Sequence, residues 1–570
     1  MTVTDTDLAT VDHPISAHPL NPVQRAYLAG ASTGFELGGV STHGYFELQG
    51  RGPVDLDRLR RSLDAVIARH EMLRASIDVD AGAVVIADTV PRFPLEVCDL
   101  RHLGPDAARS AVSGLRAEHS TLVRPPEAWP LFGVVVVLLA DDELTIMIDV
   151  DGLVVDLHSL KVVLGDVIAA YRREPLGPAS PQGTVAEIDR QIALPDPVGD
   201  DYWQGRLDEI APPPRLPLRR SPAAVGPARF ASRCHHLSAG QWERATAVAA
   251  ANGLSPSALG AAALAQTLSR WAAQSTFTVI VPCSNRPPRH RGARDAVGQF
   301  ASFVPVTVEW SAPTLAARAT GLQRRLLQAA TRGRRAGPAL MAKLADRHRA
   351  GGRSLFPVVY TSGLGLGAGA TSHPGWRLTN AASQTAQVYL DAQLTDTGDG
   401  VLVHWDTVDD VLGDETVDAM FADHVADIER MIGSPDWSEE TATPPTPNVP
   451  QELAWQPLIR PTAPTERILC GAWQHAFEGR PVGITDRLGA HGGGPRTARL
   501  AEARLADWFG EHLVPRSLLL AHETVESQAA ALPSLIPGIT EIAELSLAAA
   551  ELAGSPRTTP IDPTQTGGVR

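Results

Sequence analysis

The stretch TIMIDVDGLVVDLHSL, residues 145–160, places three carboxylates, Asp149, Asp151 and Asp156, among Ile, Met, Val and Leu side chains. Removing an ionised carboxylate from water costs several kcal/mol unless a partner compensates it. These acids are therefore expected to have partners or a chemical role.

Two strands and a helix are predicted around these acids. An apolar segment, 131–140, and an acidic turn, 141–143, precede the stretch, which is the pattern of a strand, a hairpin turn and a second strand. Beyond Asp156 the apolar period changes to that of a helix. Asp151 would then lie in the turn between strand and helix, which is a common place for functional residues.

Composition excludes several function classes. The chain has 570 residues, of which 44% are hydrophobic and 20% charged, so it can form several domains with large cores. Its formal charge of -14 argues against a nucleic-acid partner. The start lacks a basic region followed by an apolar core, and no uninterrupted apolar run approaches membrane-spanning length. Neither a secretion signal nor a membrane partner is expected.

The cysteines indicate a reducing compartment. They are scattered, with no CxxC spacing, so they favour a cytoplasmic protein without a metal framework. The four are Cys98, Cys234, Cys283 and Cys470.

The spacing of Asp151, Asp156 and Ser159 resembles the DxxxxDxxS signature of heterocyclization domains from nonribosomal peptide synthetases. In the related condensation domains the corresponding motif is HHxxxDG, and by that register Asp151 and Gly152 stand where the histidine pair would be. A polar turn between strand and helix would give the same short pattern, so longer stretches have to decide.

Several longer stretches resemble the same family in the same order. QRAYLAG at 24–30 and FELGGV at 35–40 resemble its opening helix and first strand, and RHEMLR at 69–74 resembles its RHExLR helix. His70 and Glu71 lack the second histidine of an HExxH zinc motif, so no metal site is expected there. The pair His235-His236 lacks the Asp-Gly that follows it in condensation domains and is predicted to be structural.

The second half carries the most specific resemblance. LFPVVYTSGLGLG at 355–367 resembles the family's V-V-F-T-S-x-L-G, and ASQTAQVYLDAQ at 382–393 resembles its S-Q-T-P-Q-V-W-L-D-x-Q. The segment VGQFAS at 297–302 resembles V-G-D-F-T-S but departs from it at Gln299 and Ala301. Whatever the usual Asp and Thr contribute in the family is therefore absent here.

The resemblance implies a chemistry and the residues that perform it. One carrier protein presents an acyl or peptidyl thioester and another presents Cys, Ser or Thr; an amide forms, and the side-chain thiol or hydroxyl closes a thiazoline or oxazoline with loss of water. Asp391 would be the general acid/base and Thr361 its hydrogen-bonding companion, with Gln387 as a residue that would help to position them. From the residues alone, Asp391 would be interpreted as a surface residue at the end of a strand, and the resemblance at both positions reverses that preference.

Four further residues are assigned to the architecture of the site. They are Asp151, which is also a candidate contact to substrate, together with Asp156, Ser159 and Arg286. Arg286 is predicted to be the ionic partner of Asp156, because a buried charge needs its opposite.

The implied fold class is α/β, with two chloramphenicol-acetyltransferase-like lobes in a V and a tunnel between them. A small all-α carrier-like domain follows. The predicted boundaries are a disordered tail at 1–18, an N-terminal lobe at 19–198, a C-terminal lobe at 199–436, a linker at 437–465, the carrier-like domain at 466–535 and a C-terminal tail at 536–570.

The carrier-like domain is predicted to be unable to carry a substrate. Its sequence runs from ERILCGAW at 466–473 to TVESQAAAL at 524–532, and both ends resemble a peptidyl carrier domain. Aligning its centre on TARL at 497–500 puts Gly494 where the serine that holds phosphopantetheine should be. An unrelated helical bundle is the alternative interpretation.

Three function classes remain open. An active heterocyclase would need donor and acceptor carrier proteins in trans and other synthetase subunits, whose phosphopantetheine arms tether the substrates; it would bind no cofactor or metal directly. A condensing enzyme that stops at the amide and a non-catalytic docking protein are the alternatives, which Gln299, Ala301 and the missing serine favour.

Overall fold

The computed structural model describes residues 14–552, apart from positions 33–34, 223–224, 273, 291, 334, 336, 349–352, 365–375, 435, 439–460, 478–481, 487, 489–493 and 511–513. The described residues form two compact units. The larger unit holds two α/β lobes, and the smaller holds the C-terminal helices together with short segments around residues 35–36 and 341–355.

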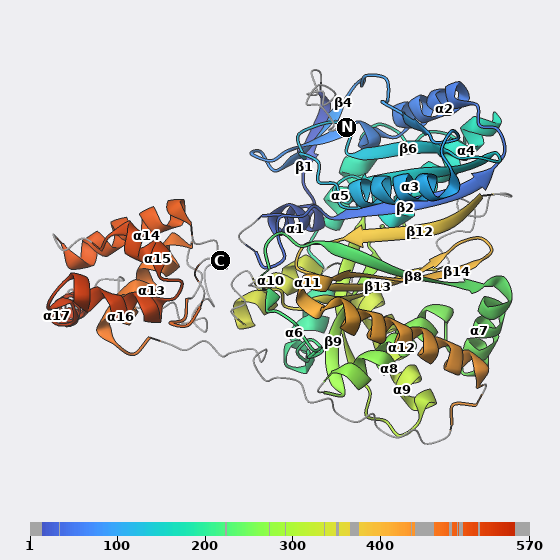
Figure 1. Cartoon of the computed structure of the whole chain (residues 1–570). Helices are drawn as coiled ribbons and strands as arrows, with labels where there is room; N and C mark the ends of the chain where they lie inside the picture. Colours follow the sequence, from blue (N-terminus) through green and yellow to red (C-terminus); the bar gives the residue numbers. More distant parts are fainter. Residues whose placement is uncertain are drawn as a thin grey trace. The chain divides into compact units, whose positions relative to one another are not determined.

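The first lobe is a five-stranded sheet with helices on both faces (Figure 1). Its strand order is β12 (Trp376–Gln384), β2 (His43–Arg51), β7 (Glu143–Asp151), β6 (Phe132–Leu138) and β5 (Glu96–Asp99). The helices α2 (Leu56–Arg69) and α4 (Leu157–Arg172) contribute to the apolar core on one face. On the other face, α3 (Pro105–His119) packs on a smaller apolar cluster.

The second lobe is a six-stranded sheet. Its strand order is β10 (Ala301–Glu309), β9 (Thr276–Ser284), β11 (Val358–Gly363), β13 (Leu390–Asp396), β14 (Gly400–Val408) and β8 (Phe230–Ser238). The central β9, β11 and β13 run parallel, and the flanking pairs are antiparallel. The larger helices of this lobe are α7 (Ala239–Ala251), α8 (Pro256–Trp271), α9 (Leu315–Gln328) and α12 (Asp414–Gly433).

The chain contains further helical elements between residues 22 and 412. They are α1 (Pro22–Gly30), η1 (Glu71–Arg74), α5 (Thr184–Ile192), α6 (Pro197–Gln204), η2 (Leu207–Glu209), η4 (Ala329–Gly333), α10 (Gly337–His348) and α11 (Asp409–Leu412). The prediction of two α/β lobes is confirmed.

The predicted boundary between the lobes at residues 198–199 does not account for one strand that crosses from the second half of the chain into the first lobe. Strand β12 comes from the second half of the sequence, yet it pairs with β2 along the edge of the first lobe's sheet, with Ala382 opposite Tyr45 (Figure 1). An uncovered edge of β2 would expose unpaired backbone groups, and β12 satisfies them. The two lobes are therefore joined by a shared strand.

The predicted tail at 1–18 is wrong for residues 14–18. They form β1 (Pro14–Pro19), which pairs with β4 (Ala83–Ala87) in a three-stranded sheet completed by β3 (Ala75–Asp78). His18 is buried there, with its Nε2 atom 3.2 Å from Oδ2 of Asp189. Residues 1–13 lie outside the described residues.

The smaller unit contains a helical core of its own. Its helices are α13 (Pro464–Ala476), α14 (Pro495–Phe509), α15 (Arg516–Ala521), α16 (Val525–Leu535) and α17 (Ile539–Leu552). The predicted tail at 536–570 is wrong for α17, because Ile539, Ala543 and Leu547 recur at helical spacing and are buried in that core. Most of the predicted linker at 437–465, and residues 553–570, lie outside the described residues.

Gly494 is the N-cap residue of α14, and its backbone N–H donates to Oγ1 of Thr497 at 2.7 Å. The carrier-like identity of this unit stays a prediction.

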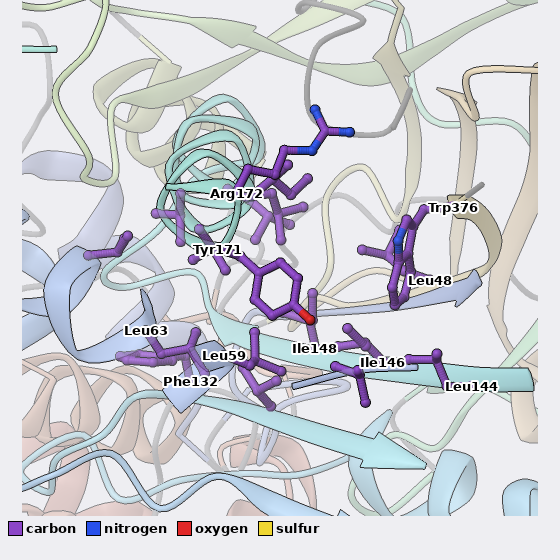
Figure 2. Close-up of a pocket in the computed structure, with 18 of the residues that line it drawn as sticks. Leu48, Leu59, Leu63, Phe132, Leu144, Ile146, Ile148, Tyr171, Arg172 and Trp376 are labelled. Carbon is purple, nitrogen blue, oxygen red and sulfur yellow. The ribbon is translucent and has the colours of Figure 1, made fainter. Parts of the chain in front are cut away.

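A pocket lies under α2 and α4 in the first lobe (Figure 2). Its volume is about 280 Å³. Most of its lining is aliphatic, and the aromatic rings of Tyr171 and Trp376 also line it. Ile146, Ile148 and Val150 of β7 face it, so the intervening Asp149 points to the opposite face of the sheet. Asp149 is thus kept apart from this apolar layer.

Among the described residues, no single helix is long and apolar enough to cross a membrane. Helices α7 and α8 meet the length and hydropathy requirement only as a pair, and they are bent by 92° at their junction.

The first strand residue of β14 requires glycine. Gly400 has a φ of 155°, and a Cβ atom there would come within 2.0 Å of the Leu237 carbonyl oxygen in β8. We predict that Gly400→Ala lowers the melting temperature, with a loss of about 1–3 kcal/mol in the free energy of unfolding.

The matched control is Gly165→Ala, in the interior of α4, where nothing lies within 4 Å of an added Cβ. That change should raise stability by about 0.5–1 kcal/mol. Equal effects of the two substitutions in thermal unfolding would contradict this account of β14.

Candidate active site

The Asp156 carboxylate caps helix α4 and holds a neighbouring segment of chain. As the N-cap residue, it accepts the Ser159 N–H at 2.7 Å through Oδ1, while Oδ2 accepts the Phe300 N–H at 3.0 Å. A carboxylate at this position also complements the positive end of the helix dipole. One side chain thus joins the start of α4 to the segment before β10.

The predicted ion pair between Asp156 and Arg286 is present. Nη2 of Arg286 lies 3.0 Å from Oδ1 of Asp156 and 2.7 Å from the Ser159 hydroxyl, and all three residues are buried. The other guanidinium nitrogen, Nη1, donates to two backbone carbonyls, those of Ala293 and Ala296. Both Nη atoms of the buried guanidinium therefore have acceptors inside the protein.

The other two acids of the opening stretch have different surroundings. Asp149 pairs with Arg124 and lies 3.5 Å from Nε2 of His43 and 3.6 Å from Nδ1 of His119. Burial opposes ionisation of Asp149, but the interactions with His119, His43 and Arg124 outweigh it and hold its pKa well below the usual range.

Asp151 is buried without such a direct ionic partner among the described residues. It accepts the Leu153 N–H at 2.8 Å, and burial raises its pKa to about 6, against the lowering effects of that bond and of the His43 and Arg124 charges. At neutral pH this carboxyl is thus close to its titration range.

Gln299, one of the two departures from the family pattern, braces the turn after Asp151. Its Nε2 donates to the Gly152 carbonyl at 2.8 Å, and its Oε1 accepts the Ala301 N–H at 2.8 Å. A Cβ at Gly152 would lie 2.8 Å from Cγ2 and 3.1 Å from the carbonyl oxygen of Thr42. Any side chain at position 152 would therefore require Thr42, the residue before β2, to shift.

The second group of predicted residues meets in the sheet of the second lobe. Asp391 is the second residue of β13, and Oγ1 of Thr361 on the parallel neighbour β11 donates to its Oδ1 at 3.0 Å. Burial raises the pKa of Asp391 to about 6, and the hydrogen bonds from Thr361 and Ser383 oppose this rise. A carboxyl titrating near neutral pH can both give and take a proton.

Two polar partners of Asp391, Ser383 and Gln393, were not predicted from the sequence. The Ser383 hydroxyl lies 3.1 Å, and Nε2 of Gln393 3.0 Å, from Oδ2 of Asp391. The same two groups reach Oδ2 of Asp406 at 3.0 and 3.1 Å. The alternation of β13, which puts Asp391 and Gln393 on one face, was the available signal for Gln393.

Tyr27 of α1 connects the two groups of residues. Burial and the negative charges of Asp156 and Asp391 hold the pKa of its phenol well above the usual range, while a hydrogen bond from Gln299 lowers it. The phenol is therefore protonated at neutral pH and lies within electrostatic reach of both carboxylates. Sequence analysis had recorded Tyr27 only as part of a motif.

Gln387 occupies a turn rather than a strand. It has a positive φ of 66°, and its backbone N–H donates to the Leu37 carbonyl at 3.3 Å. The side-chain contacts that orient Asp391 come from Thr361, Ser383 and Gln393. The predicted positioning role of Gln387 stays a prediction.

His235 and His236 lie within β8, away from the carboxyls described above. His236 contacts Thr397 and Asp399 through its Nε2 atom, at 3.2 and 3.3 Å. In the part of the chain that the structure describes, no three His, Cys, Asp or Glu side chains are grouped as a metal ion would require.

Comparison with known proteins places this geometry in a family. The model of the condensation domain family matches residues 16–362, which is more than half of the chain. The chain belongs to the condensation domain family. The matched region includes the Asp156–Arg286 pair and ends next to Thr361.

Two curated relatives, one of them named for an oxazoline product, match most of the chain. Phenyloxazoline synthase MbtB from Mycobacterium sp. (strain MCS) is 34% identical over 449 residues, covering 77% of this chain and 37% of that protein. Pyochelin synthetase PchF from Pseudomonas aeruginosa (strain UCBPP-PA14) is 30% identical over 510 residues, covering 84% of this chain and 27% of that protein. The chain thus spans less than two fifths of either relative.

A solved structure agrees with the same branch of the family. The EpoB cyclization-docking bidomain from Sorangium cellulosum has a TM-score of 0.66 and 28% sequence identity, over 75% of this chain and 89% of that one. The similarity to heterocyclization domains predicted from the motifs is confirmed by these relatives.

Loss of the Arg286 charge should destabilise the fold. We predict that Arg286→Met lowers the free energy of unfolding by about 3–5 kcal/mol, because the Asp156 carboxylate is left buried without its counter-charge. Denaturant unfolding at neutral pH measures the change.

The double variant Arg286→Met/Asp156→Asn serves as the control, since it removes both charges. It should recover part of the loss, and a double variant as unstable as the sum of the two single variants would contradict a direct interaction.

Ionisation of the buried Asp391 carboxyl should lower the free energy of unfolding as pH rises. Its pKa is about 6 in the folded protein and 3.8 in the absence of the fold. Between these values the folded chain holds a proton that the unfolded chain has lost, so the free energy of unfolding decreases as pH rises. We predict that Asp391→Asn gains about 2–3 kcal/mol relative to the parent between pH 4 and pH 7.

Asp399, with a half-exposed side chain, provides the control for this measurement. Asp399→Asn shows what the loss of a half-exposed carboxylate costs, and that cost should be small because solvent screens the side chain. A stability difference between Asp391→Asn and the parent that does not change from pH 4 to pH 7 would show that the Asp391 carboxyl is not perturbed.

Proposed function

We propose that this chain catalyses heterocyclization on carrier-bound substrates. It would condense an acyl or peptidyl thioester with Cys, Ser or Thr and then cyclodehydrate the product to a thiazoline or oxazoline. The observation that carries the proposal is the Asp391 carboxyl, which is buried, titrates near neutral pH and is fixed by Thr361 and Ser383.

The dehydration step needs such a group. After the side-chain thiol or hydroxyl has added to the amide carbonyl carbon, the former carbonyl oxygen must leave as water and the nitrogen must lose its proton. Asp391 would donate a proton to the departing hydroxyl and then accept the proton from nitrogen, so that the C–O bond breaks and the C=N bond forms. General acid/base catalysis of this kind contributes about 10²–10⁴-fold.

Thr361 has a positioning role in this proposal. Its hydroxyl donates to one oxygen of Asp391 while Ser383 holds the other, so the rotation of the carboxyl is fixed before substrate arrives. A group oriented in advance loses no free energy to reorientation during the reaction.

Asp156, Ser159 and Arg286 would shape the site from the first lobe. Their network fixes the segment of Gly298 and Phe300, and with it Gln299 beside Tyr27. Asp151, whose pKa is near neutral, remains the candidate substrate contact in that lobe.

The partners follow from the same proposal. Donor and acceptor peptidyl carrier proteins would act in trans, within a synthetase that has other subunits, and their phosphopantetheine arms would deliver the substrates. The glycine at position 494 supports carriers in trans, because it offers no hydroxyl for attachment of an arm.

Intact-mass analysis of the acceptor carrier tests the proposal. The protein is mixed with a donor-loaded carrier and with acceptors loaded with Cys, Ser or Thr in turn. A condensed product lighter by one water would support heterocyclization and identify the nucleophile. Condensed product at full mass would indicate a condensing enzyme that stops at the amide, and no transfer would favour a docking protein.

Two substitutions should separate the steps. We predict that Asp391→Asn and Thr361→Val leave amide formation largely intact but slow ring closure, by about 10²-fold or more for Asp391→Asn. The linear condensed product should accumulate on the acceptor carrier. Asp399→Asn is the control, and equal yields of cyclised product from all four proteins would refute the assignment.

A further inference from the structure

Asp406 lies directly opposite Asp391. The two residues form a facing pair on the antiparallel strands β13 and β14, and Asp406 is fully buried. Like charges directly opposite one another destabilise a sheet, and two carboxylates in one buried site cannot both ionise easily. The pair is therefore expected to keep a proton at neutral pH.

The surroundings supply no positive charge to relieve this conflict. Among the described residues, no Lys or Arg forms an ion pair with either carboxyl. His404, on the same strand as Asp406, lies 3.8 Å away, but burial lowers its pKa to about 4, so it is neutral at pH 7. On the neighbouring strand β8, burial and the Asp406 charge raise the pKa of Cys234 to about 12, so its thiol is uncharged at pH 7. The phenol of Tyr27, near Asp391, is also protonated and uncharged.

The surroundings instead favour a protonated Asp406. Burial raises its pKa to about 8, the Ser232 hydroxyl 2.5 Å from Oδ1 opposes this rise, and the charge of Asp391 adds to it. Of the two carboxyls, Asp406 is thus the one that holds the shared proton at rest.

A hydroxyl bridges the two carboxyls. Ser383 Oγ lies 3.1 Å from Oδ2 of Asp391 and 3.0 Å from Oδ2 of Asp406. A hydroxyl can accept one hydrogen bond while donating another. Ser383 can therefore accept the proton of Asp406 as it passes its own to Asp391.

We infer that Asp406 is a positioning residue that stores a proton for Asp391 and exchanges it through the Ser383 hydroxyl. This inference rests on the proposed heterocyclization, in which Asp391 must be protonated before the hydroxyl of the ring intermediate departs.

The proton is conserved over the cycle. Asp406 gives a proton to Ser383, which gives its own to Asp391; Asp391 then protonates the departing hydroxyl and the C–O bond breaks. The nitrogen proton returns to the Asp391 carboxylate as the C=N bond is completed. The reverse transfer through Ser383 restores Asp406, so the only product released besides the ring is water.

The pH dependence of ring closure distinguishes storage from a purely structural role. In the parent, ring closure should be maintained up to about pH 8 and fall above it, where Asp406 loses its proton. In Asp406→Asn, which keeps the shape but stores no proton, the fall should begin near pH 6, where Asp391 alone titrates. The pH at which ring closure falls by half should therefore be about two units lower in Asp406→Asn than in the parent, with unchanged amide formation.

A second variant keeps the test decisive if Asp406→Asn folds poorly. Ser232→Ala removes the hydrogen bond that favours the ionised form of Asp406, so the alkaline fall should move above pH 8. Asp399→Asn should change neither the rate nor the profile. An alkaline fall that stays at the parent's pH in both the Asp406 and Ser232 variants would overturn the inference.

Infrared spectroscopy without substrate separates failure of this inference from failure of the proposed function. The parent at pH 7 should show the C=O stretch of a protonated carboxyl that is absent from Asp406→Asn and present in Asp399→Asn. This band would support the proton store even if the protein closed no ring, and its absence from the parent would contradict the store even if ring closure were observed.

Discussion

A buried ion pair between Asp156 and Arg286 joins parts of the chain that are 130 residues apart. Arg286 also donates from Nη1 to the carbonyls of Ala293 and Ala296, and its guanidinium lies over the ring of Phe300. The loop before β10 thus has one position relative to α4. That position brings Gln299 to the Gly152 turn and to Tyr27.

The same physical constraint, a carboxylate that must not be left charged and alone in the interior, is resolved in different ways along this chain. Asp149 is paired with a cation, and its pKa is low. Asp151, Asp391 and Asp406 are buried without a direct cationic partner among the described residues, and their pKa values move up toward neutral pH. Pairing gives a structural residue, whereas burial without pairing gives a carboxyl that can exchange protons at physiological pH.

The sequence predicted the parts of this structure that depend on local patterns. The period of residues 145–160 gave β7 and α4, and the requirement for a counter-charge correctly joined Arg286 to Asp156. It could not reveal that β12 pairs with β2, because strand exchange depends on tertiary packing rather than on the composition of either strand. The segments expected to be tails contain β1 and α17, whose few apolar residues are buried only by partners distant in sequence.

Only part of the site could be predicted, because the rest also depends on tertiary packing. Family motifs identified Thr361 and Asp391, and their hydrogen bond is present in the structure. Asp406 and Ser383 come from flanking strands, and their contact with Asp391 depends on the register of β13 with β14 and on the path of β12. The residue pattern within a single segment does not predict how that segment aligns with its neighbouring strands.

The most direct test of the central claim bypasses amide formation. A carrier protein loaded with a linear N-acyl-cysteinyl thioester is incubated with the parent or with Asp391→Asn, and the intact mass of the carrier is followed at neutral pH. The parent should convert the linear thioester to a product lighter by one water. The Asp391→Asn variant should leave the linear thioester almost unchanged. Equal conversion by both proteins, or no conversion by a parent that forms the amide, would contradict it.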